Sequence, residues 1–238
     1  MTRALTKDQI RKLHEVVAQR KAAHVVAARR SSAAFTSYVM RDESGQQLKL
    51  ADFHHEWHKL LALHEQLIIW GSAEIGKTIQ LISYVAWKIG IDPSIRVVIA
   101  SKTKGKAAQI LGAIVNVMSS AAYREVFPHV VIIGNNAHTL RVLGYDGKNP
   151  TVQAYQFKAP IVGNRVDLLI FDDILDRSNT RNEQTRDEWH QFYKDTYISR
   201  LTRRGQVVFI SNAWHPRDLL HRLPEDGGRV PTRDPMWA

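Results

Sequence analysis

The chain contains no cysteine, which excludes disulfide bonds and metal sites built from thiolates. No apolar run approaches the ~20 residues that a membrane-spanning helix needs. The first residues, Met1 to Asp8, form no apolar secretory segment, and neither internal repeats nor low-complexity tracts occur. Together these absences fit an intracellular globular protein.

The sequence does contain enough apolar material for one substantial core. Its 238 residues are 44% hydrophobic and 24% charged, which is ordinary for a globular domain and allows one core with at most a small appendage. The charge is basic, because 33 Lys and Arg residues outnumber 23 Asp and Glu residues, for a net charge of +10. A polyanionic partner is the natural inference; the alternative is a globular protein that is merely basic.

A phosphate-binding loop is the most informative motif. It has the pattern G-x-x-x-x-G-K-[ST] and consists of Gly71, Ser72, Ala73, Glu74, Ile75, Gly76, Lys77 and Thr78. An apolar run at 67–70 precedes it and helical apolar spacing at 79–87 follows it, which disfavours an ordinary Gly-rich turn. In such a loop, backbone N–H groups face phosphate oxygens at the positive end of a helix. Lys77 then reaches the β- and γ-phosphates, and the Thr78 hydroxyl ligates Mg²⁺.

Two adjacent acids, Asp172 and Asp173, supply candidates for the second half of a nucleotide site. They end the apolar run 168–171, so a parallel sheet would place them at the carboxyl edge of a strand, beside the phosphate-binding loop. Asp172 is then expected to hold Mg²⁺ and Asp173 to orient the attacking water. The alternative is a pair of acids that caps a strand. Ser211 and Asn212 end a later strand and either contact the γ-phosphate or satisfy a turn.

Apolar patterning predicts an α/β fold with a mostly parallel sheet covered by helices on both faces. The expected strands are 67–70, 96–101, 139–143, 152–157, 167–171 and 206–210, with 139–143 and 152–157 forming a hairpin. The expected helices are the first ~30 residues, 53–63, 79–87, 107–118 and a polar helix at about 180–199. Thr6 is the expected cap of the first helix. That helix is either a docking arm, through Lys21, Arg29 and Arg30, or has a solvated face.

The combination resembles the ATPase domain of phage large terminases, the motors that package double-stranded DNA into procapsids. The resemblance covers about residues 50–223, and its stretches are the phosphate-binding loop, 97–103 with Ala107, 163–173, 189–201 and 214–220. The stretches 189–201 and 214–220 are the specific ones, because most P-loop ATPases lack them.

The resemblance implies a RecA-like core of the additional-strand type that uses Mg²⁺ and ATP. It implies double-stranded DNA, a portal protein and a small terminase subunit as partners, with a ring of subunits on the portal in the host cytoplasm. It also implies that Ser211 and Asn212 occupy the position of the coupling motif. Phe53 or Trp57 is expected to stack on adenine; the alternative for both aromatic residues is the helix core.

Three departures from the family pattern bear on the site. Relatives often carry Arg before Gly-Lys-Thr, where this chain has Ala73, Glu74 and Ile75. We expect Glu74 to point away from the phosphates and toward a basic neighbour, since like charges ~4 Å apart cost on the order of 1–4 kcal/mol. Many relatives have Asp-Glu at the position of Asp172 and Asp173. The charge-stabilising arginine has two candidates, Arg165 and Arg200, either donated to a neighbouring subunit or engaged in an ordinary surface ion pair.

We therefore expect an N-terminal helical arm at 1–48, a P-loop ATPase core at 49–223 and a linker or tail at 224–238 toward a nuclease domain. No DNA cleavage is expected from this chain. Two other functions remain open. One is a helicase-like nucleic-acid remodelling ATPase, and the other is a non-catalytic nucleotide-binding assembly module.

Overall fold

A computed structural model describes residues 6–144, 147–161 and 165–224. Gly163, Asn164 and most of the expected tail at 224–238 lie outside the described residues. No helix within the described ranges combines the length and the hydrophobicity needed to cross a membrane.

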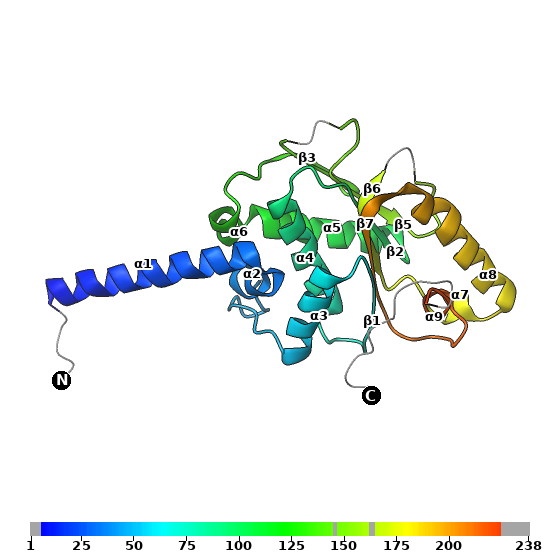
Figure 1. The fold of residues 1–238 in the computed structure, drawn as a ribbon, viewed down its shortest axis with the longest axis horizontal. Helices are drawn as coiled ribbons and strands as arrows, with labels where there is room; N and C mark the ends of the chain where they lie inside the picture. The colour runs from blue at the N-terminus through cyan, green and yellow to red at the C-terminus, as the bar shows by residue number, and fades with distance from the viewer. Residues whose placement is uncertain (1–5, 145–146, 162–164, 225–238) are drawn as a thin grey trace.

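A seven-stranded sheet forms the centre of the molecule (Figure 1). Its spatial order is β1-β7-β6-β2-β5-β4-β3; the first five of these strands are parallel to one another, and β4 and β3 are antiparallel. The bounds are β1 Gln66–Trp70, β2 Val97–Ser101, β3 Ile132–Asn135, β4 Thr139–Val142, β5 Val152–Gln156, β6 Val166–Asp172 and β7 Leu201–Ser211. The expected mostly parallel sheet and the β4–β5 hairpin are confirmed.

Helices cover both faces of this sheet. On one face lie α1 Lys7–Arg30, α2 Ser32–Val39, α3 Asp52–Leu63, α4 Lys77–Ile91, α5 Lys104–Ser119 and α6 Ala121–Val126. On the other lie α7 Arg177–Thr180, α8 Glu183–Phe192, a π-helical turn Tyr193–Tyr197, a 3₁₀ turn Ile198–Arg200 and α9 Leu219–Arg222.

The central strands are buried on both sides, because alternate residues enter the two cores. In β6, Leu168 and Ile170 pack beneath α4 and α5, whereas Leu169 and Phe171 pack against α8 and the π-helical turn. A strand buried in this way reads as a continuous apolar run.

The first helix projects away from the body of the molecule (Figure 1). Thr6 caps it as expected, in a reciprocal capping box with Gln9. The regularly spaced apolar residues face solvent, with Ile10, Leu13, Val16 and Val17 between 40% and 55% exposed. Only its last turns join the main core, where Ala28 is fully buried.

Several elements differ from the expectation. Helices α2 and α6 and strand β3 were not anticipated. The helix expected at about 180–199 is instead α8 followed by a π turn and a 3₁₀ turn, which direct Tyr193 and Tyr197 into the core. Leu63, the last residue of α3, is 73% exposed although it ends an otherwise apolar stretch.

Candidate nucleotide-binding site

The phosphate-binding loop connects the carboxyl end of β1 to the first residue of α4. Its curvature depends on left-handed backbone at two positions, Glu74 with φ 67° and Gly76 with φ 80°. The loop begins beside β7, where the Gly71 amide donates to the carbonyl oxygen of Ser211 over 3.2 Å. The motif therefore lies at the carboxyl edge of the parallel strands, where ligands bind in open α/β sheets.

Lys77 directs its ammonium group over this loop. Nζ donates to the carbonyl oxygen of Gly71 at 2.8 Å and also to that of Ser72. It further donates to Oδ1 of Asn212 at 3.1 Å, although 135 positions separate the two residues. The phosphate-binding lysine and the end of β7 thus meet at the carboxyl edge of the sheet.

Thr78 connects the loop to the end of β6 through a hydrogen bond. Its hydroxyl donates to Oδ1 of Asp172 over 2.9 Å. Asp172 is only 1% exposed, and burial raises the pKa of its carboxyl group, which the Thr78 hydrogen bond and the nearby Lys106 partly oppose. Ser101, at the end of β2, donates to the backbone oxygen of Asp172 and fixes the strand end.

Asp173 follows in a left-handed conformation, with φ 48°. Its amide continues the ladder to the Ile210 carbonyl oxygen at 2.8 Å, and its Oδ2 lies 3.3 Å from Nζ of Lys106. The structure thus brings Lys77, Thr78, Asp172 and Asp173 together at one edge of the sheet, and their roles in a nucleotide site stay predictions. Lys106 was not anticipated, since only its place at the start of a helix after a strand tip could have indicated it.

The oxygen atoms at this edge fit a hard divalent cation. The Thr78 hydroxyl and the Asp172 carboxylate are both oxygen donors of the kind Mg²⁺ prefers, and Asp172 Oδ2 is buried without a hydrogen-bond partner. Within the described residues, no group of three or more His, Asp or Glu side chains is arranged to hold a metal ion. A cation here would therefore take further ligands from phosphate and water.

Ser211, the last residue of β7, is buried, and its hydroxyl donates to the Asn212 carbonyl oxygen at 3.1 Å. Glu74 is exposed and forms no ion pair with any residue that the structure describes.

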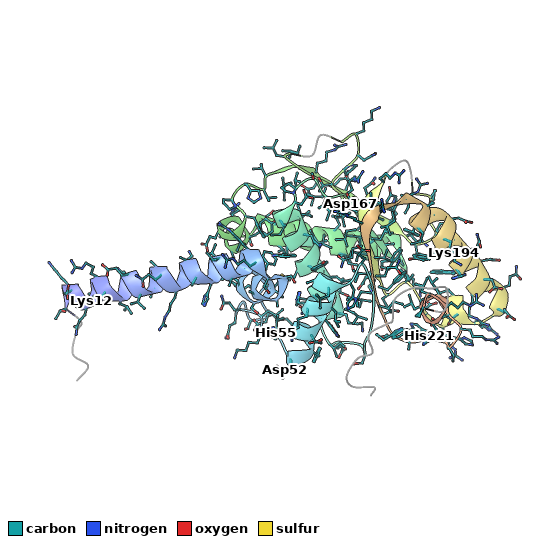
Figure 2. The ribbon with its side chains drawn as sticks, in the orientation of Figure 1. Lys12, Asp52, His55, Asp167, Lys194 and His221 are labelled. Atoms are coloured by element: carbon teal, nitrogen blue, oxygen red, sulfur yellow. The ribbon has the colours of Figure 1, made fainter. Side chains whose placement is uncertain are left out.

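Helix α3 also contacts the phosphate-binding loop, through His54. Trp57 is 2% exposed and belongs to the core, so its ring is covered by protein and the helix-core alternative holds for it. Phe53 is half-buried and remains the candidate for stacking. Sequence reasoning missed His54, which accepts from the Ala51 amide through Nδ1 at 3.2 Å and donates to the Ile75 carbonyl oxygen through Nε2 at 2.8 Å. Asp52 and His55 flank this turn (Figure 2).

Arg165 and Arg200 lie at the opposite edge of the sheet. Each precedes a strand, and Val166 of β6 pairs with Leu201 of β7. This edge also holds Asp167 (Figure 2), which forms an ion pair with Arg96 at 2.7 Å. Asp172 lies six residues further along β6 than Val166, so the two strand ends are about 20 Å apart at ~3.3 Å per residue. The backbone of each arginine therefore lies at the edge opposite to the phosphate-binding loop of its own chain.

Comparisons with known proteins find similarity in structure but not in sequence. No family model matches the chain, and no curated protein is significantly similar to it. The crystal structure of the HK97 bacteriophage large terminase superposes with a TM-score of 0.57 at 15% identity, over 84% of this chain and 41% of that one. The large terminase of a thermophilic bacteriophage gives 0.54 at 16% identity, over 78% and 46%. A variant of the ATPase domain of the Thermus phage P74-26 large terminase gives 0.50 at 17%, over 68% and 65%.

The strand order, with the ends of β1, β6 and β7 brought together at one edge, gives the chain a RecA-like α/β fold. More particularly, the chain has the fold of the ATPase domain of phage large terminases. It spans less than half the length of the first two of these proteins.

Proposed function

We propose that this chain is the Mg²⁺-ATP-hydrolysing motor domain of a phage large terminase and drives double-stranded DNA into procapsids. One observation carries the proposal. Lys77 and Thr78 of the phosphate-binding loop contact Asn212 and Asp172, which come from two other strand ends. A domain that only binds phosphate has no need for this three-part cleft.

Each residue has a defined task in this mechanism. The loop amides hold the β- and γ-phosphates, and the Lys77 ammonium exchanges the Gly71 and Ser72 carbonyl oxygens for phosphate oxygens. Thr78 and Asp172 would hold Mg²⁺, which when bound neutralises charge on the phosphate oxygens. Asp173 orients the attacking water. Because Asn212 contacts Lys77, the end of β7 responds when Lys77 moves, and this is the proposed coupling to DNA.

The proposed partners follow from the terminase fold and from the charge. A net charge of +10 suits a double-stranded DNA track. We propose that subunits form a ring on a portal protein in the host cytoplasm, that a small terminase subunit delivers DNA, and that Arg165 or Arg200 serves the site of a neighbour. The domain boundaries at 48/49 and 223/224 remain predictions.

Replacing Lys77 or Asp172 with Ala tests the site. ATP turnover should fall at least ~100-fold in both variants, because each removes a charge that acts on the triphosphate. Turnover is measured by phosphate release with and without double-stranded DNA, and nucleotide binding by calorimetry. The control is Lys12→Ala, on the projecting helix (Figure 2), which should behave like the parent protein.

The parent domain alone is expected to hydrolyse slowly, since a neighbour's arginine contributes ~10³-fold or more in related enzymes. Undiminished turnover in both variants would reject the assigned site. Strand displacement by the parent protein would favour the helicase-like alternative. Failure to bind ATP, with intact binding to a portal protein, would favour the non-catalytic assembly module.

A further inference from the structure

A lysine that the phosphate-binding motif does not include faces both acids of the site. Lys106 lies in the first turn of α5, next to the strand tip of β2. Its Nζ is 3.3 Å from Oδ2 of Asp173 and 3.8 Å from Oδ2 of Asp172. The lysine side chain is 40% exposed, whereas that of Asp172 is 1% exposed. The ammonium group therefore covers the acid pair from the open side of the crevice.

The backbone fixes this placement. Ser101 of β2 is in register with Asp172 of β6, and its hydroxyl holds the Asp172 backbone oxygen at 2.9 Å. Thr103 then caps α5 by accepting from the Lys106 amide at 3.2 Å. The helix must therefore begin beside the acids, with Lys106 three residues after the cap.

A lysine in the first turn of a helix is electrostatically unfavourable for the helix itself. The start of a helix carries partial positive charge and favours acids, yet the first turn of α5 contains Lys104 and Lys106 and no acid. A local rule broken without a local gain points to a functional reason. The two carboxylates provide one, because adjacent negative charges repel each other and an ammonium group close to both offsets that repulsion.

The acid pair also has carboxylate oxygen atoms that accept no hydrogen bond from the described residues. Oδ2 of Asp172 and Oδ1 of Asp173 are buried and have no hydrogen-bond partner. Within the phosphate-binding loop, the one charge besides Lys77 is that of Glu74, which is negative. The cation that balances Asp173 is thus supplied by α5 rather than by the loop.

We propose that Lys106 is a positioning residue of the nucleotide site. Its ammonium group turns the Asp173 carboxylate into the crevice and balances the acid pair before a divalent cation binds. This inference rests on the proposed function, since it gives Asp173 the task of orienting water.

Three variants test the inference: Lys106→Ala, Lys106→Arg and the matched control Lys104→Ala. Lys104 lies in the same helical turn and is exposed, so its removal changes the net charge equally without touching the acids. In Lys106→Ala, kcat should fall by about 10- to 100-fold with KM within about threefold, because a misplaced catalytic group slows the reaction without weakening substrate binding. Lys106→Arg should recover most of the loss, and Lys104→Ala should match the parent protein.

A second readout does not depend on hydrolysis. Mn²⁺ binding to the nucleotide-free protein is followed by electron paramagnetic resonance, with melting temperatures confirming that each variant is folded. Lys106→Ala should bind Mn²⁺ several-fold more tightly, because the ammonium group no longer competes for the carboxylates. Lys104→Ala should show no such gain.

The inference is overturned if Lys106→Ala and Lys104→Ala have equal Mn²⁺ affinities, whatever the ATPase result. It is also overturned if the parent protein hydrolyses ATP and Lys106→Ala retains full kcat. A parent protein that neither binds nor hydrolyses ATP would instead refute the proposed function, and the Mn²⁺ titration would then still decide whether Lys106 balances the acids.

Discussion

At the scale of single residues, the imidazole of His58 joins three helices. Nδ1 accepts from the Ser32 hydroxyl of α2 at 2.9 Å, and Nε2 donates to Oε1 of Gln80 of α4 at 2.9 Å. Burial lowers the pKa of His58 to about 4, from 6.5. A neutral ring is therefore built into the contact between the N-terminal helices and the helix that carries Lys77.

This burial predicts a specific pH dependence of stability. Above pH 6.5 His58 is neutral in both the folded and unfolded chains, and below that pH the unfolded chain gains a proton that the folded chain cannot accept until about pH 4. Between pH 8 and pH 5 the residue should remove on the order of 2 kcal/mol from the free energy of unfolding. Urea denaturation at both pH values measures this difference.

His58→Gln is the informative variant, because it cannot titrate. Its free energy of unfolding should change less between pH 8 and pH 5 than that of the parent protein. His14→Gln, at an exposed position of α1, is the control and should keep the parental slope. Equal slopes in all three proteins would contradict the assignment.

At the scale of secondary-structure elements, α3 acts as a support for the phosphate-binding loop. His54 accepts from the Ala51 amide at the helix start and donates to the Ile75 carbonyl oxygen in the loop. A Cβ added at Gly76 would lie 3.5 Å from the ring. The helix therefore holds the loop at its left-handed glycine.

His54→Ala should weaken ATP binding by about 10-fold, equivalent to about 1.4 kcal/mol, because a mobile loop must be ordered when the phosphates bind. The dissociation constant is measured by calorimetry. His55→Ala, whose ring is exposed one position further on, should bind ATP as the parent protein does. Unchanged affinity in His54→Ala would show that the loop keeps its shape without this support.

The elements themselves were largely readable from the sequence. Strands such as 167–171 are buried on both faces and therefore appear as apolar runs between helices. By contrast, α2 is short, and its apolar residues are buried through contacts with α1, α4 and α6, which lie far from it in the sequence or outside its own short span. The residues of the phosphate-binding loop and the acid pair follow from motifs, but the contacts of His54 and Lys106 depend on how α3 and α5 approach the strand tips. Spacing along the chain does not encode that approach.

At the scale of the whole molecule, the nucleotide cleft and the two candidate arginines occupy opposite edges of one sheet. If either arginine acts, it must act on another subunit. We therefore predict that Arg165→Ala or Arg200→Ala loses turnover only under conditions where the protein assembles. The expected loss is on the order of 10³-fold for the arginine that acts.

Mixing variants tests this prediction directly. An arginine variant keeps an intact cleft, and Lys77→Ala keeps both arginines, so mixed assemblies should regain part of the turnover that each protein lacks alone. Turnover is measured across mixing ratios at a fixed total concentration. No recovery at any ratio would contradict donation between subunits, and Arg11→Ala, on the exposed part of α1, serves as a mixing control that should give no change.

The separation of these two edges by the length of β6 also constrains how copies of the chain can associate. A donor surface and an acceptor surface on opposite edges require head-to-tail contacts rather than a self-complementary pair. In an open arc of such contacts, the nucleotide site of one terminal subunit receives no arginine from a neighbour. Only closure of the circle would give every subunit a donor, so per-subunit turnover should rise with arc length and reach its ceiling at closure.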